Sequence, residues 1–188
     1  ALLVERAAEM VALARDTIGH PANAHLRGRV ELLAADVTLA GNARIAAGLA
    51  DSSFDFAILN PPFNEERDRA TPDPLKRDAH VMRPGMFESW IRTAAAIVRP
   101  RGGIALIARP QSLPAVLAAL GGRFGGCRIV PVQPRADRPA IRIIVRGVRG
   151  SRQALSLEPP LVLHGDAGHG HAPRADAVCN GRESLFGD

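Results

Sequence analysis

Residues Asn60, Pro61, Pro62 and Phe63 form the part of the sequence best suited to chemistry. They follow the apolar run FDFAIL at 54–59, which is typical of a buried strand. Because proline cannot donate to a sheet ladder, two prolines in succession end the strand at Asn60 and hold the backbone extended. The Asn60 side chain and the Pro61 carbonyl then become fixed acceptors for the two hydrogens of a planar NH2 group, and Phe63 offers a flat face beside them. We therefore expect residues 60–63, the amine-holding motif, to bind an amino nitrogen.

Methyl transfer is the chemistry that such a motif suits. An aromatic amine or amide nitrogen is a poor nucleophile because its lone pair is delocalised. Two acceptors on its hydrogens orient that lone pair toward an activated methyl group and raise its electron density. A hydroxyl acceptor would need a general base, and the motif contains no His or Lys that could act as one. A turn that merely ends a strand is the alternative interpretation.

The elements that must position this motif alternate between strand-like and helix-like segments. Strands are predicted at 1–5, 29–36, 54–60, 101–110, 127–134 and 140–148, and helices at 6–18, 85–100 and 111–121. A loop or short helix is expected around 44–49, and the last two strands are predicted to pair as an antiparallel hairpin. This alternation favours an α/β fold with a mostly parallel sheet and helices on both faces.

Two regions lack a clear periodic pattern. Residues 64–83 are charged and contain prolines, which indicates a mobile surface loop. From residue 150 onward only 154–164 resembles ordered structure, so 150–188 is predicted to be a C-terminal extension or tail. The whole of 1–188 is long enough for one domain with a substantial core, and nothing in its length requires two.

Polar side chains are predicted to meet at one edge of the sheet. In parallel α/β sheets, ligands bind beyond the carboxyl ends of the strands. Those ends carry Glu5, Asp36 and Asn60 here. Each acid alone is as readily explained as a cap for the following helix. The three together favour a cofactor or substrate site.

The net charge of +5 comes almost entirely from arginine, since Lys76 is the only lysine. This balance suits a polyanionic partner such as RNA, although a GC-rich coding sequence would also produce it. Cys127 and Cys179 have no metal-ligand spacing, so no metal site is indicated. No apolar stretch approaches the roughly 20 residues needed to cross a bilayer. We expect a cytoplasmic protein without a membrane partner, because the sequence starts without a signal-type segment.

Four segments together resemble the class I S-adenosylmethionine-dependent methyltransferases with an NPPF/NPPY motif. They are LLVERAAEMVALARDTI, RVELLAADV, FDFAILNPPF and IVRPRGGIALIAR. More narrowly, residues 2 to about 165 resemble the bacterial family of tRNA(Val) adenine-N6 methyltransferases, which includes proteins called predicted O-methyltransferases. The resemblance implies a Rossmann-like sheet, S-adenosylmethionine as cofactor and adenine N6 of tRNA as methyl acceptor.

The resemblance also implies roles for individual residues. Glu5, with the adjacent Arg6, is implied to bind the two ribose hydroxyls of the cofactor. Asp36 and Val37 are implied to contact its adenine. The amine-holding motif is implied to hold the target amino group and to stack on its base, with Asn60 also near the cofactor.

One part of the family pattern is absent from this chain. The family's first strand and glycine-rich loop would precede the position of Ala1. We therefore interpret the domain as N-terminally incomplete, with a chain that binds the cofactor abnormally as the alternative. The loop at 64–83 is expected to close over the substrate.

Other functions stay open at this point. The amine-holding motif also suits methylation of a protein glutamine at N5 or of guanine at N2. A small-molecule O-methyltransferase and a non-catalytic remnant that binds RNA or a protein partner are further alternatives. The sequence leaves the oligomeric state open, a homodimer included.

Overall fold

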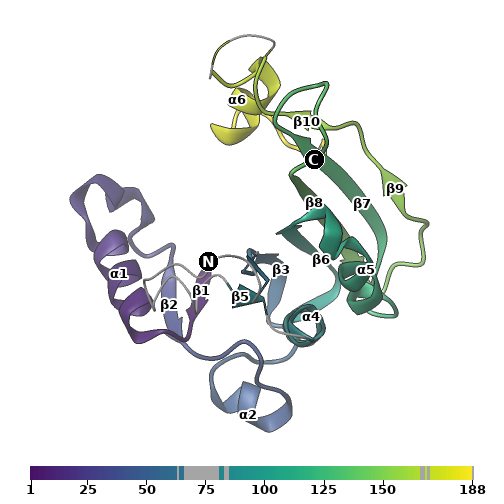
Figure 1. The fold of residues 1–188 in the computed structure, drawn as a ribbon. Helices are drawn as coiled ribbons and strands as arrows, with labels where there is room; N and C mark the ends of the chain where they lie inside the picture. Colours follow the sequence, from purple (N-terminus) through teal and green to yellow (C-terminus); the bar gives the residue numbers. More distant parts are fainter. Residues whose placement is uncertain (63, 66–80, 83–84, 166–167, 169, 188) are drawn as a thin grey trace.

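The computed structural model of the protein describes residues 1–62, 64–65, 81–82, 85–165, 168 and 170–187. Its largest sheet has the strand order β10 (Leu161–Val162), β7 (Phe124–Gln133), β8 (Arg142–Arg149), β6 (Val98–Ala108) and β3 (Phe54–Leu59), with β9 (Ser156–Leu157) paired to β7 (Figure 1). β3 and β6 are parallel, and β8 lies antiparallel between β6 and β7. The predicted α/β fold with a C-terminal antiparallel hairpin is confirmed.

A second, two-stranded parallel sheet contains β1 (Leu2–Glu5) and β2 (Glu31–Ala34). Helix α1 (Ala8–Gly19) and the 3-10 helix η1 (Pro21–Leu26) connect these strands, and α2 (Gly41–Ala46) follows them. The predicted strands and the first predicted helix are therefore present, with ends shifted by a few residues.

Two short strands correct the prediction of a loop over 64–83. β4 (Asn64–Glu65) pairs with β5 (Val81–Met82) in a sheet of its own. Such short strands carry too few residues for a periodic signal, because pairing rather than local sequence defines them. The rest of that predicted loop, at 66–80 and 83, lies outside the described residues.

Helices α4 (Met86–Ile97) and α5 (Leu113–Leu120) build the main core against one face of the large sheet, with η2 (Pro110–Ser112) leading into α5. The α4 residues Phe87, Ile91 and Ala94 are buried, as the apolar spacing predicts. On the sheet side, alternate strand residues such as Ile104 and Val145 fill the same core. The apolar face of the helices and the inward-facing residues of the strands thus form one apolar layer.

The opposite face of the sheet is covered at one end by α6 (Pro173–Cys179). Ala175 of α6 packs with Val130 and Leu161 in a smaller core. Helices therefore lie on both faces, as predicted. The sequence leaves the order of residues 165–188 open, because a helix of 7 residues is too short to show a clear apolar period.

The same face is open over β3. Ile58 is 81% exposed and Phe56 is 41% exposed, although both are large apolar residues. The Phe56 ring lies over Gly103, where an added Cβ would come within 2.2 Å of the ring.

No helix in the part of the chain that the structure describes is long and apolar enough to cross a membrane.

Candidate active site

Glu5 ends β1 and turns the chain into α1. β1 pairs with β2 so that Glu5 lies beside Ala34, and the amide of Ala35 donates to the Glu5 carbonyl at 3.0 Å. The side-chain Oε1 accepts from the amides of Arg6 at 2.7 Å and Ala7 at 2.8 Å. These bonds fix the carboxylate at the edge of the sheet. In the described structure no hydrogen bond engages Oε2, so this oxygen can accept from a ligand.

Asp36 lies two residues beyond β2 and occupies a tight turn. Its Oδ1 accepts from the amide of Thr38 at 2.8 Å and from the Thr38 hydroxyl at 2.7 Å. The amide of Leu39 donates to the Asp36 carbonyl at 3.2 Å, which closes the turn. Arg6 Nη1 lies 3.9 Å from Asp36 Oδ2. The pairing of β1 with β2 thus places the Asp36 turn near Glu5 and Arg6.

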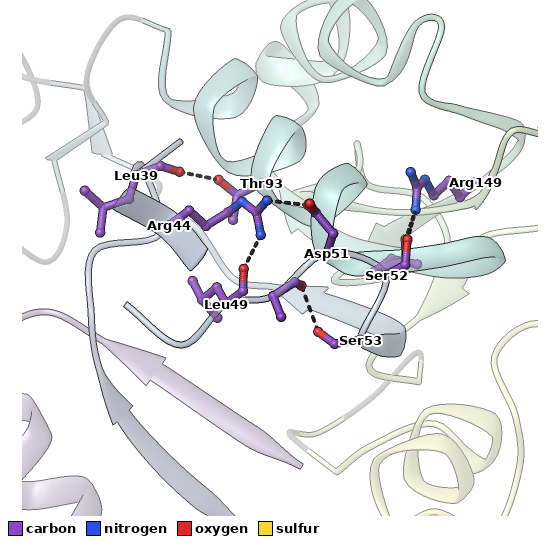
Figure 2. Close-up of polar contacts among 10 residues, drawn as sticks. Leu39, Arg44, Leu49, Asp51, Ser52, Ser53, Thr93 and Arg149 are labelled. Carbon is purple, nitrogen blue, oxygen red and sulfur yellow. Dashed lines mark hydrogen bonds and ion pairs between the residues drawn. The ribbon is translucent and has the colours of Figure 1, made fainter. Parts of the chain in front are cut away.

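Thr93 of α4 holds the segment that follows Asp36. Its hydroxyl donates to the Val37 carbonyl at 2.6 Å. It also lies 3.3 Å from the Leu39 carbonyl oxygen (Figure 2). The Thr93 residue is 4% exposed. Sequence reasoning missed this contact, because a threonine on an apolar helix gives no sign of a partner more than 50 residues away.

Arg44 organises the segment that leads into β3. Its guanidinium, with a side chain that is 5% exposed, donates to the Leu49 carbonyl and to the Asp51 carboxylate (Figure 2). The next residue, Ser52, donates its amide to Ala96 at 2.9 Å, and its hydroxyl accepts from Arg149 at 3.1 Å. These contacts tie the start of β3 to α4 and β8. They thereby fix the path of the strand that ends at the amine-holding motif.

The amine-holding motif begins as predicted, directly after β3 ends at Leu59. Asn60 is exposed, Pro61 is buried and Pro62 is half-buried, so the prolines anchor the backbone while the amide faces outward. Phe63 lies outside the described residues. Asn60 follows a strand of the large sheet, whereas Glu5 ends a strand of the small one. Within the described residues no hydrogen bond or ion pair joins them. The predicted convergence of all three strand ends stays a prediction.

The chemistry of this site fits the nucleoside part of S-adenosylmethionine. A fixed carboxylate with one open oxygen, such as Glu5, is suited to the neighbouring hydroxyls of a ribose. The turn that carries Asp36 and Val37 follows β2, the strand that pairs with β1, and Arg6 lies 3.9 Å from Asp36. An adenine carries an amine donor, for which a carboxylate is an acceptor. The residues present therefore fit this group.

Comparison with known proteins agrees with this assignment. No protein-family model and no curated protein matches the chain. Among solved structures, a predicted O-methyltransferase from Agrobacterium tumefaciens is 39% identical, with a TM-score of 0.83 over 98% of this chain and 78% of its own.

Two more distant structures show the fold alone. The tRNA (m1A58) methyltransferase from Aquifex aeolicus is 10% identical, with a TM-score of 0.52 over 80% of this chain and 53% of its own. A methyltransferase from Streptococcus mutans, solved in complex with SAH, is 11% identical, with a TM-score of 0.50 over 79% of this chain and 74% of its own. These two structures and the Agrobacterium tumefaciens relative agree with the Rossmann-like fold of this chain. The chain belongs to the family of the Agrobacterium tumefaciens protein, and it is an S-adenosylmethionine-dependent methyltransferase.

Proposed function

We propose that the protein methylates an exocyclic amino nitrogen, and that its acceptor is adenine N6 in an RNA, most specifically a tRNA. The observation that carries this proposal is the amine-holding motif at the end of β3. Pro61 is buried there and Asn60 is exposed, so a rigid backbone presents the amide to a ligand. A fixed pair of acceptors recognises an NH2 group by its two hydrogens.

The residues of the chain act mainly by positioning. Asn60 Oδ1 and the Pro61 carbonyl accept the two amine hydrogens. Glu5 and Arg6 hold the ribose of S-adenosylmethionine, and this cofactor supplies a methyl group on a positively charged sulfur. The two acceptors turn the nitrogen lone pair out of the plane of the base, which raises its nucleophilicity. The amine needs no dedicated general base, because its proton is lost readily once the nitrogen carries positive charge.

The charge of the chain supports an RNA acceptor. A net charge of +5 with 24 basic residues favours the phosphate backbone of a nucleic acid. A small-molecule O-methyltransferase is the second candidate, because the Agrobacterium tumefaciens relative is described as a predicted O-methyltransferase. Mass spectrometry of the methylated product separates these candidates, since N6-methyladenine and an O-methyl group differ in their fragmentation.

The Asn60→Ala variant tests the proposed role of the motif. We expect methylation of unmodified tRNA to fall about 10²-fold or more, because the acceptor that orients the amine is lost. The affinity for S-adenosylmethionine should stay close to that of the unchanged protein. Asn42→Ala is the matched control, since Asn42 is an exposed amide on α2. Full turnover by Asn60→Ala would remove the proposed role.

We also propose that a further strand, not contained in residues 1–188, completes the sheet between β1 and β3. Within the described residues, β1 pairs with β2 alone and β3 with β6 alone. Both strands bear exposed apolar residues, Leu3 at 46% and Ile58 at 81%. Two open parallel edges with apolar faces suit one more strand.

Calorimetry with S-adenosylmethionine tests this proposal on residues 1–188 and on a chain extended at its N-terminus. We expect the extended chain to bind at least tenfold more tightly. Equal affinity of the two chains would contradict the proposal.

A further inference from the structure

We infer that Thr93 is a positioning residue for the adenine of the cofactor, because its buried hydroxyl fixes the segment that carries Asp36 and Val37. The inference rests on the proposed role of these two residues in binding adenine. Thr93 itself lies on α4 and is not proposed to contact the cofactor. Its effect is transmitted through the backbone that it holds.

The geometry connects Thr93 to Asp36 through one turn. The Thr93 hydroxyl lies 2.6 Å from the Val37 carbonyl oxygen and 3.3 Å from that of Leu39. These carbonyls flank Thr38, whose amide and hydroxyl both donate to Asp36 Oδ1. A shift of the Thr38 segment therefore moves the Asp36 carboxylate as well. The neighbouring Arg92 adds a contact of 3.5 Å to the Thr38 carbonyl.

Packing alone does not explain a threonine at this position. Thr93 is 4% exposed and lies between the buried residues Ile91 and Ala94, where valine would fill nearly the same volume. Hydroxyls within helices commonly bond to a carbonyl of their own preceding turn. Ser89 of the same helix does so, with its hydroxyl 3.2 Å from the Gly85 carbonyl. Thr93 contacts a different segment of the chain, 54 to 56 residues away.

The test compares four variants of the protein by calorimetry with two ligands, SAH and S-inosylhomocysteine. In S-inosylhomocysteine a carbonyl replaces the adenine amine. Thr93→Val removes the hydroxyl at constant shape, and Thr93→Ser retains it. Asp36→Ala reports on the adenine site itself. Ser89→Ala is the matched control, because it removes a hydroxyl from the same helix without touching the Asp36 turn.

We expect Thr93→Val to raise the Kd for SAH about tenfold, which equals about 1.4 kcal/mol. The preference for SAH over S-inosylhomocysteine should shrink, because the Asp36 carboxylate that accepts from the adenine amine is no longer fixed in position. The KM for the methyl acceptor should not change. Thr93→Ser and Ser89→Ala should both bind SAH as the unchanged protein does.

The outcomes separate this inference from the proposed function. If Asp36→Ala weakens SAH binding and Thr93→Val does not, the inference is wrong and the adenine site stands. If neither variant weakens binding, the proposed adenine role of Asp36 fails and the inference fails with it. If Thr93→Val weakens the binding of SAH, of S-inosylhomocysteine and of the methyl acceptor by the same factor, the hydroxyl only stabilises the fold. That result would also overturn the inference.

Discussion

The Arg44→Met variant examines how a buried guanidinium stabilises the path into β3. Methionine keeps the apolar stem of the side chain packed and removes only the charged head. Two bonds are lost, one to the Leu49 carbonyl and one to the Asp51 carboxylate (Figure 2). Their surroundings differ greatly, because Leu49 is 1% exposed whereas the Asp51 side chain is 63% exposed.

This difference in exposure sets the magnitude. A buried carbonyl left without its donor costs about 1–3 kcal/mol. An ion pair with a solvated carboxylate contributes about 0–1 kcal/mol. We therefore expect Arg44→Met to lower the free energy of unfolding by about 1–4 kcal/mol, most of it from the buried carbonyl. Asp51→Asn, which removes the charge of the exposed partner alone, should lower it by less than about 1 kcal/mol.

Urea unfolding at neutral pH, followed by circular dichroism, measures both variants. Arg44→Lys extends the series, because a single ammonium cannot bond to both partners in the forked geometry of a guanidinium. The reasoning would be refuted if Asp51→Asn destabilised the protein as much as Arg44→Met. That result would assign the stabilisation to the ion pair and not to the buried carbonyl.

Two further predictions concern the C-terminal half of the chain. Hydrogen bonds from Arg128 and Ser156 lower the pKa of Glu158 from 4.5 to about 2. The stability that this carboxylate contributes is therefore fully present above about pH 4.5, and it is lost as the pH falls toward 2. The difference in Tm between the unchanged protein and Glu158→Gln should therefore shrink as the pH falls over that range. The exposed control Glu9→Gln should show no such change. A Tm difference for Glu158→Gln that stays constant from pH 7 to pH 2 would contradict this role of Glu158. Gly103→Ala should lower the free energy of unfolding by about 1–3 kcal/mol, because its Cβ would lie 2.2 Å from the Phe56 ring. Phe56→Ala should relieve much of that loss in the double variant, and strictly additive effects in chemical denaturation would count against the clash.

Much of this fold follows from local patterns in the sequence. The apolar face of α4 and the alternation along β6 predict a shared core, and Ile91 and Ile104 both lie in it. The first two predicted strands pair with each other, and this pairing leaves Arg6 3.9 Å from Asp36. These features depend on residues close together in sequence or on the general geometry of parallel strands.

The features that the sequence does not reveal depend on distant partners. Arginine is a residue type usually found at the surface. Only the fold of the segment around Arg44 brings Leu49 and Asp51 to its guanidinium. Thr93 meets Val37 only once α4 packs beside the end of β2. The tail helix α6 is stabilised by contacts with Val130 and Leu161, which its own 7 residues do not disclose.

The uneven burial of the two sheets has a consequence for local opening. None of the residues of β1 or β2 is buried, whereas β6, β7 and β8 supply much of the core. Strands with few buried contacts open at a lower free energy than the core does. Backbone amides at 2–5 and 31–34 should therefore exchange with deuterium sooner than those of β8. Glu5 and Asp36, which we propose to bind S-adenosylmethionine, belong to this readily opened region. If they do bind it, the cofactor should slow exchange there first, because binding stabilises the closed form of the small sheet.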